Sequence, residues 1–190
     1  MKKKNWIVWS LLLVAGMASS MAQQRVTRND IKVTLLSLGS GSSRFTYERA
    51  FSPRHSAELT VGIIGWGWDI MNKTEQSDGL LMKAAYKWNL IPQRNADSWL
   101  AGFYVKPEWV IADFDYIAAQ SDWLEHTFQM ALLAECGYQW VKDWFDFDVY
   151  CGLGPSWGSG NSNNYFHSFM LYPRDSWLAF TAGFRIGIAF

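Results

Sequence analysis

Two carboxylates in one short segment, Asp146 and Asp148, are the residues of this sequence that most resemble a catalytic pair. Neighbouring carboxyl groups can divide the roles of acid and base, one donating a proton and the other accepting it. The surrounding residues alternate between apolar and acidic types, however, and such alternation predicts a β-strand with one polar face. Any strand of this kind places acids two positions apart on one face, so we favour ion pairing over catalysis here.

His126 offers a second opportunity for chemistry. A lipid-modifying barrel enzyme would need a histidine, an acid and a serine together at its outer rim. Partners for His126 would be Ser121, Asp122, Asp175 and Ser176, if their loops meet. Polar loops commonly contain such residues, so an enzyme is the alternative hypothesis. The sequence has no phosphate-binding glycine loop between a strand and a helix, no Cys-x-x-Cys and no histidine pair, so we expect no cofactor and no metal.

The composition limits the class of protein. Basic and acidic residues are balanced at 17 each, which argues against a nucleic-acid partner. Aromatic residues make up 17% of the chain, with 12 tryptophans, and this enrichment is typical of proteins that present rings to a membrane interface. A surface that stacks on carbohydrate is the alternative. Most tryptophans fall near the ends of predicted strands: Trp66, Trp68, Trp88, Trp99, Trp109, Trp123, Trp140, Trp144, Trp157 and Trp177.

Residues 1–22 have the three parts of a secretory signal peptide. Lys2, Lys3 and Lys4 form a basic start, residues 6–15 are apolar, and residues 20–22 are small or apolar before a cut ahead of Gln23. A single membrane anchor is the alternative, but the apolar stretch is shorter than the roughly 20 residues that a spanning helix needs. We therefore predict that residues 23–190 form an exported, single-domain protein.

The remaining chain is dominated by alternation of apolar and polar residues, which predicts eight strands. These cover about residues 31–38, 43–51, 56–66, 79–91, 98–110, 126–141, 144–156 and 176–190. Connections after the second, fourth and sixth strands are short, and those after the third, fifth and seventh are long, as in outer-membrane barrels. The sequence thus predicts an all-β fold, an eight-stranded antiparallel up-and-down transmembrane β-barrel.

A membrane-spanning sheet must close, because lipid cannot satisfy its backbone donors and acceptors. Apolar rows then face lipid, and the alternate rows fill an interior just wide enough for side chains. Buried charges are tolerated when they are paired, so the inward residues predict an ion-pair network that plugs the lumen. It comprises Glu48, Glu58, Lys83, Lys87, Lys106, Glu108, Glu135, Asp146, Asp148 and Arg185, with Arg44 and, if the first strand has that parity, Lys32.

The two cysteines fall in the sixth and seventh strands. With a turn at Lys142 and Asp143, Cys136 would face Val149, and the two cysteines would be diagonal neighbours about 7–8 Å apart. That separation is at or beyond the limit for a disulfide. We therefore predict free thiols on the lipid-facing side. A register change of two residues would permit a bridge, which an exported protein could form.

Three segments give the chain a family resemblance: FTYERAFSPRHSAELTVG at 45–62, GLLMKAAYKW at 79–88 and AGFRIGIAF at 182–190. The chain resembles small outer-membrane barrels of the OmpA/OmpX type, and is similar to a group of uncharacterised barrels with DUF-type names. The resemblance implies the outer membrane of a Gram-negative bacterium, with its lipids and the barrel-assembly machinery as partners. It also implies that Phe184, Ile186, Ile188 and Phe190 form the signal that this machinery reads.

The resemblance carries no catalytic residues. We expect a structural or surface-binding role through the extracellular loops. The alternatives are a lipid-modifying enzyme around His126, a narrow pore, and a soluble lipocalin-like barrel whose apolar residues face inward.

Overall fold

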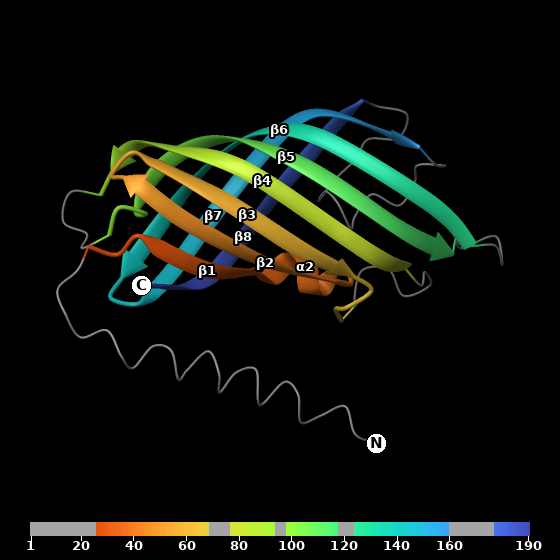
Figure 1. Cartoon of the computed structure of the whole chain (residues 1–190), viewed down its shortest axis with the longest axis horizontal. Helices are drawn as coiled ribbons and strands as arrows, with labels where there is room; N and C mark the ends of the chain where they lie inside the picture. The colour runs from red at the N-terminus through yellow and green to blue at the C-terminus, as the bar shows by residue number, and fades with distance from the viewer. Residues whose placement is uncertain (1–25, 69–76, 94–97, 118–123, 160–176) are drawn as a thin grey trace, which may run out of the picture.

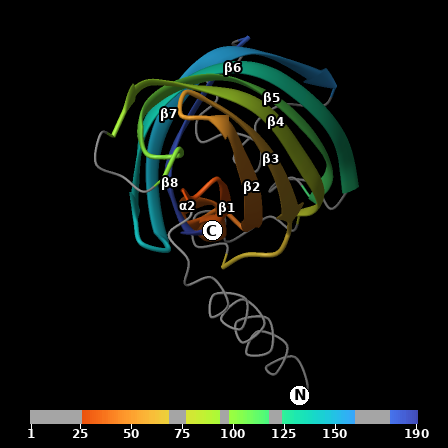
Figure 2. The same ribbon diagram turned by 60° about the vertical axis from the view of Figure 1, so that its left-hand side comes forward.

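The alternating segments form eight antiparallel strands in the computed structural model, which describes residues 26–68, 77–93, 98–117, 124–159 and 177–190 (Figure 1). Consecutive strands pair with each other, and the first pairs with the last, so the sheet closes into a barrel (Figure 2). This confirms the predicted all-β, up-and-down barrel. The strands are β1 (Asn29–Thr34), β2 (Ser42–Ser52), β3 (His55–Ile64), β4 (Ser77–Pro92), β5 (Gly102–Ile117), β6 (Leu124–Lys142), β7 (Phe145–Ser159) and β8 (Leu178–Ala189). The predicted signal peptide lies outside the described residues.

Two predicted strand boundaries were wrong. Residues 35–38 were expected to continue the first strand, but Leu35–Gly39 form a short helix, α2. The apolar run there has no alternation to distinguish a strand from a helical turn. The fifth strand was expected at 98–110, yet it begins at Gly102 and continues to Ile117, through much of the predicted loop at 111–125. The connection before β5 was predicted to be the shorter of the two and the one after β5 the longer. The strand bounds show the reverse, because β4 ends at Pro92, β5 ends at Ile117 and β6 begins at Leu124.

The β6–β7 turn sets the register of this hairpin. Lys142 pairs with Phe145, so the turn residues are Asp143 and Trp144, one position later than predicted. Asp143 has φ 56°, in the left-handed region that aspartate tolerates better than most residues. Because moving a turn by one residue shifts every cross-strand pair by two, the register predicted for this hairpin was wrong.

The barrel has two distinct ends. The terminal end holds Asn29, Phe190 and the turns that follow β2 and β6; the opposite end, which holds α2, is here called the loop end (Figure 1). At the terminal end, the Asn29 amide donates to the Phe190 carbonyl at 2.9 Å and the Phe190 amide donates back at 2.8 Å. The two ends of the described chain thus meet in the β1–β8 seam.

The two faces of the sheet carry opposite kinds of side chain. Large apolar residues on the outer wall and its rims have exposed fractions of 40% to 75%. The charged side chains that alternate with them along the strands are buried in the interior. This arrangement is the reverse of a soluble globular domain, where charged residues are rarely buried.

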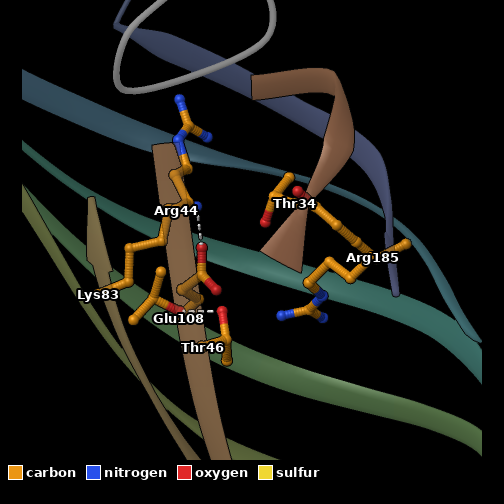
Figure 3. Close-up of a pocket in the computed structure, with 8 residues that line it drawn as sticks. Thr34, Arg44, Thr46, Lys83, Glu108 and Arg185 are labelled. Atoms are coloured by element: carbon orange, nitrogen blue, oxygen red, sulfur yellow. Dashed lines mark hydrogen bonds and ion pairs between the residues drawn. The ribbon is translucent and has the colours of Figure 1, made fainter. Parts of the chain in front are cut away.

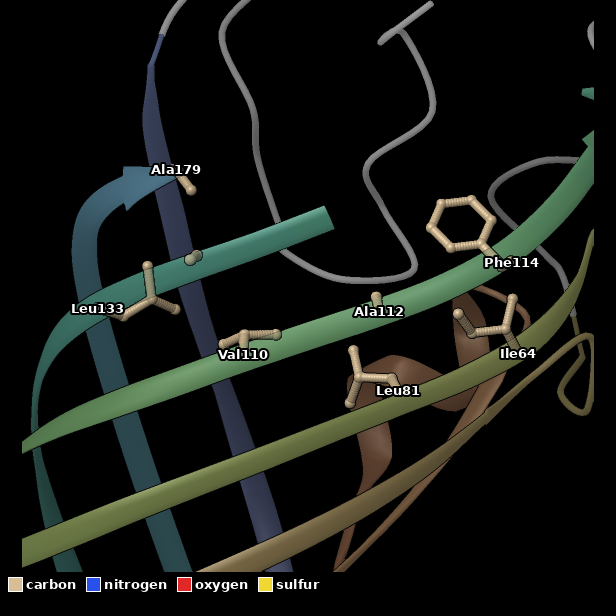
Figure 4. Packing of buried hydrophobic residues seen from close by; sticks show 8 residues of the cluster. Ile64, Leu81, Val110, Ala112, Phe114, Leu133 and Ala179 are labelled. Atoms are coloured by element: carbon tan, nitrogen blue, oxygen red, sulfur yellow. The ribbon is translucent and has the colours of Figure 1, made fainter. Parts of the chain in front are cut away.

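The interior has three layers along the barrel axis. At the terminal end, Ala50, Leu100, Ala101, Val141 and Ala189 form a small apolar cluster. Charged residues fill the middle. Toward the loop end, inward residues of β3 to β6 and β8 form a larger apolar cluster, here called the upper cluster (Figure 4): Ile64, Leu81, Val110, Ala112, Phe114, Ala131, Leu133 and Ala179.

Candidate functional site: the enclosed ionic network

Lys32 on β1 is the centre of the charged layer. Its Nζ lies 2.5 Å from Glu48, 3.3 Å from Asp148 and 3.4 Å from Glu58. Asp30 at 3.8 Å and Asp146 at 4.0 Å complete the shell of carboxylates. Lys32 is fully buried, so these carboxylates replace the water that its ammonium group loses.

Arg185 on β8 joins this centre to the far side of the barrel. One terminal nitrogen lies 3.1 Å from Glu58, and the other lies 2.7 Å from Asp148. The Tyr104 hydroxyl accepts a hydrogen bond from Arg185 at 3.2 Å and donates one to Asp148 at 2.7 Å. The Arg185 guanidinium also lies 4.5 Å from the ring centroid of Tyr150. A planar cation with several donors suits such a branched contact.

Two further groups of ion pairs extend the network. Lys106 contacts Glu58, and lies 3.1 Å from both Glu108 and Glu135, while Lys83 lies 2.6 Å from Glu108. In the second group, Lys87 lies 2.9 Å from Glu48 and donates to Gln139. Each of the ten predicted lumen residues is therefore buried and takes part in at least one ion pair.

The sequence analysis named Lys32 only conditionally and did not include three other members of the network: Asp30, Tyr104 and Gln139. The first strand is short and has no clear apolar row, so its parity was not decided by the sequence. Tyr104 and Gln139 do lie on inward faces of their strands. The network was predicted from charged residues alone, so these two neutral side chains were not included. A buried hydroxyl or amide nevertheless needs hydrogen-bond partners, as a buried charge does.

Acidic side chains outnumber basic ones by one inside the described barrel. Seven acidic and six basic side chains are buried: Asp30, Glu48, Glu58, Glu108, Glu135, Asp146 and Asp148, against Lys32, Arg44, Lys83, Lys87, Lys106 and Arg185. Both carboxylate oxygens of Asp146 and one of Asp30 are buried without a hydrogen-bond partner. Both carboxylate oxygens of Glu135, farther from the terminal end, are also buried without a hydrogen-bond partner, so unsatisfied carboxylates occur at more than one level of the lumen.

A small cavity remains between the charged layer and the upper cluster (Figure 3). Its free volume is about 10 Å³, close to the lower limit for one water molecule. It is lined by Thr34, Arg44, Thr46, Thr60, Lys83, Glu108, Tyr150 and Arg185. A space of this size does not conduct ions or admit a substrate to the buried carboxylates.

The terminal mouth is closed by residues 98–101, which were expected in a strand. The Trp99 amide donates to the Thr27 carbonyl at 3.1 Å, and the Arg28 guanidinium lies 3.9 Å from the centroid of the Trp99 ring. Leu100 and Ala101 are buried in the apolar cluster beneath. The alternation of the strand predicted at 98–110 placed Ala101 on the outward face, and this was wrong because Ala101 is buried. Trp99 is partly buried against the same cluster at the rim of the barrel.

His126 lies on the outer wall of β6, toward the loop end. Its Nδ1 is 2.9 Å from Asp115 and its Nε2 is 3.2 Å from Asp113, both on β5. The imidazole is 64% exposed. The expected partners Ser121, Asp122, Asp175 and Ser176 lie outside the described residues. A histidine held by two carboxylates could act as a base toward a molecule at this rim.

The sequence was expected to lack the Gly-x-Ser-x-Gly pattern of hydrolase nucleophiles, but the Gly-Pro-Ser-Trp-Gly segment around Ser156 (154–158) matches it. In those enzymes the serine occupies a sharp turn between a strand and a helix. Here Ser156 lies within β7, faces inward and donates to the Trp177 carbonyl at 3.3 Å. The segment lacks the geometry of a nucleophile.

The two cysteines are direct cross-strand partners, contrary to the predicted diagonal placement. Cys136 pairs with Cys151, and their sulfur atoms lie 3.8 Å apart on the outer wall. Both thiols are free in the structure. The cause of the difference is the later turn at Asp143 and Trp144.

Within the described part of the chain, no cluster of His, Cys, Asp or Glu has the arrangement of a metal site. No helix among the described residues is long and apolar enough to cross a membrane. Searches for similar proteins found no matching family model, no matching curated protein and no matching solved structure.

Proposed function

We propose that the protein is an outer-membrane β-barrel with a structural or surface-binding role through its extracellular loops, and that its lumen is plugged. One observation carries this proposal: rows of large apolar side chains line the exposed outer wall, while the charges of the ionic network are enclosed. A sheet in hydrocarbon needs an apolar exterior and no unpaired edge, and the closed barrel meets both conditions.

The aromatic residues support the same environment. Trp88, Trp140 and Trp144 are exposed near the terminal end, and Trp66, Trp68, Trp157 and Trp177 are exposed near the loop end. Two aromatic belts are typical of proteins that cross a bilayer. Trp109 departs from this pattern because it lies in the middle of β5. On this proposal the terminal end faces the periplasm and the loop end faces outward.

The filled interior favours a structural role over a narrow pore. The ion pairs, the upper cluster and the closed terminal mouth leave no open passage among the described residues. The function is then assigned to surfaces rather than to the lumen. Phe184, Ile186, Ile188 and Phe190 remain the proposed assembly signal; the first three lie on β8, and Phe190 follows directly.

Fluorescence quenching by brominated lipids tests the proposal directly. The full chain is refolded into vesicles whose acyl chains carry bromine, with unbrominated vesicles as the control. Because exposed tryptophans lie on the outer wall, we expect strong quenching together with resistance to carbonate extraction. A monomer that stays soluble without detergent and shows no quenching would instead support the lipocalin-like alternative.

The contacts of His126 favour a second candidate, a lipid-modifying enzyme at the outer rim. Cells expressing the wild type, His126→Ala or an empty vector would be compared by mass analysis of envelope lipids. A modified lipid that appears only with the wild type would establish this activity. Identical lipid profiles in the three strains would eliminate it.

A further inference from the structure

Cys136 and Cys151 occupy the same level of the outer wall. They are direct partners in the β6–β7 register, and their sulfur atoms are 3.8 Å apart. Val105 on β5 and Ala182 on β8 flank the pair, so apolar residues lie on both sides. The sequence contains only these two cysteines, and each therefore has a single partner within the chain.

The backbone at this position suits a disulfide. Directly opposed residues in an antiparallel pair have Cα atoms about 4.5–5.5 Å apart, and disulfides form at about 4.4–6.8 Å. The sulfurs need to approach from 3.8 Å to a bond of about 2.0 Å. Rotation of the side chains supplies this movement, because both point outward from the sheet and neither is packed in the lumen.

We propose that Cys136 and Cys151 form an intramolecular disulfide in the mature protein, which cross-links β6 to β7. A thiolate of one cysteine attacks a disulfide of a periplasmic dithiol–disulfide oxidant, releases one thiolate of that oxidant and forms a mixed disulfide. The second cysteine, as a thiolate, attacks the mixed disulfide and releases the other. The protein loses two protons and two electrons, and the oxidant is reduced to its dithiol.

The position of the two cysteines on the outer wall determines when this exchange occurs. This step rests on the proposed membrane location, in which that wall contacts lipid. Thiolates are the reactive species, and a charged sulfur in hydrocarbon carries a large desolvation cost. The bridge therefore forms while the β6–β7 hairpin is still in water, before insertion. After insertion, lipid excludes water-soluble reductants, so the cross-link persists.

The redox state in cells is the first test. Cells expressing the full chain are quenched with acid, free thiols are blocked with N-ethylmaleimide in denaturant, and the intact mass is measured. We expect no label and a mass lower by two hydrogens, with two labels appearing when reduction precedes blocking. Cys136→Ser and Cys151→Ser should each carry one label without reduction. Two labels on the unreduced wild type would overturn the proposal.

A register control makes the geometry itself testable. Cys151→Ser combined with Val149→Cys places the second thiol opposite Tyr138 and diagonal to Cys136. When oxidised glutathione is present while the chain refolds in water, before detergent covers the outer wall, the wild type should form an internal bridge and this variant should retain two glutathione adducts. Bridging by the variant but not by the wild type would contradict the proposal. A bridged protein recovered in the soluble fraction would refute the membrane location and leave the bridge standing.

Discussion

The charged layer and the upper cluster fill the same barrel by different means. In the charged layer, Lys32, Glu58 and Arg185 reach across the lumen and hold specific partners. In the upper cluster, Leu81, Val110 and Leu133 pack without directional contacts. Removal of a charge leaves its partner buried and unpaired, whereas removal of a methyl group leaves only a small void. The two layers should therefore respond differently to substitution.

Lys32→Met should give the largest effect. The change removes the cation shared by five carboxylates, and breaking a buried ion pair costs about 3–5 kcal/mol. Urea unfolding in detergent micelles, followed by tryptophan fluorescence, measures the loss. Lys142→Met, at the exposed end of β6, is the matched control and should change stability little. Equal effects of the two substitutions would refute the central role of Lys32.

Leu81→Ala tests the upper cluster by the same measurement. Leu81 is fully buried, and truncation of a buried leucine to alanine costs about 2–5 kcal/mol. We expect a value below that of Lys32→Met, because no polar group is left unpaired. The outward neighbour Leu80, which is 60% exposed, is the control and should lose far less in micelles.

Glycine-to-alanine substitutions at two positions test how much space each layer leaves for an added methyl group. At Gly137 an added Cβ would lie 2.5 Å from the Tyr104 hydroxyl oxygen, whereas at Gly62 it would lie 3.0 Å from Cδ2 of Leu81. Gly137→Ala should cost about 1–3 kcal/mol by overpacking, and should displace the hydroxyl that links Arg185 to Asp148. Gly62→Ala should cost less, because a leucine side chain can move. A larger loss at Gly62 would contradict this comparison.

Lys83 and Glu108 lie at the boundary between the layers, next to Leu81 and Val110 along their strands. Glu108→Leu alone should cost about 3–5 kcal/mol, because it removes the carboxylate that pairs with buried Lys83. Lys83→Met alone should cost less, because Glu108 keeps Lys106 at 3.1 Å. The double substitution extends the upper cluster by one level, and should stay within about 1 kcal/mol of the wild type. A double-mutant cycle in urea measures the coupling. Additive losses would show that the boundary pair is not a separable unit.

Alternation was sufficient to predict the eight strands and, in β2, β3, β4, β6, β7 and β8, which residues face inward, because a period of two follows directly from strand geometry. It failed where alternation is absent: Leu35–Gly39 became α2, and residues 98–101 close the mouth. The turn residues were displaced by one position, and this was enough to bring Cys136 opposite Cys151.

The partners within the charged layer could not be predicted in the same way. The sequence places Arg185 and Glu58 on inward faces, but their contact joins β8 to β3 across the lumen. Such contacts depend on the stagger of all strands around the barrel. The partners of Lys32 could not be predicted for the same reason, because its five carboxylates lie on four strands. In addition, its own strand has no clear apolar row.

The shortness of β1 affects how the sheet opens and closes. β1 has six residues, whereas β8, its partner across the closing seam, has 12. The ladder that completes the cylinder joins segments far apart in the chain, so it forms late in folding, after the local hairpins. The two ladders of β1, to β2 and to β8, have five residue pairs each, fewer than any other ladder of the barrel, so amide hydrogen exchange should begin along β1. The ion pairs of Lys32 with residues of β2, β3 and β7 then help to hold β1 in the sheet, because the backbone ladders of β1 are short.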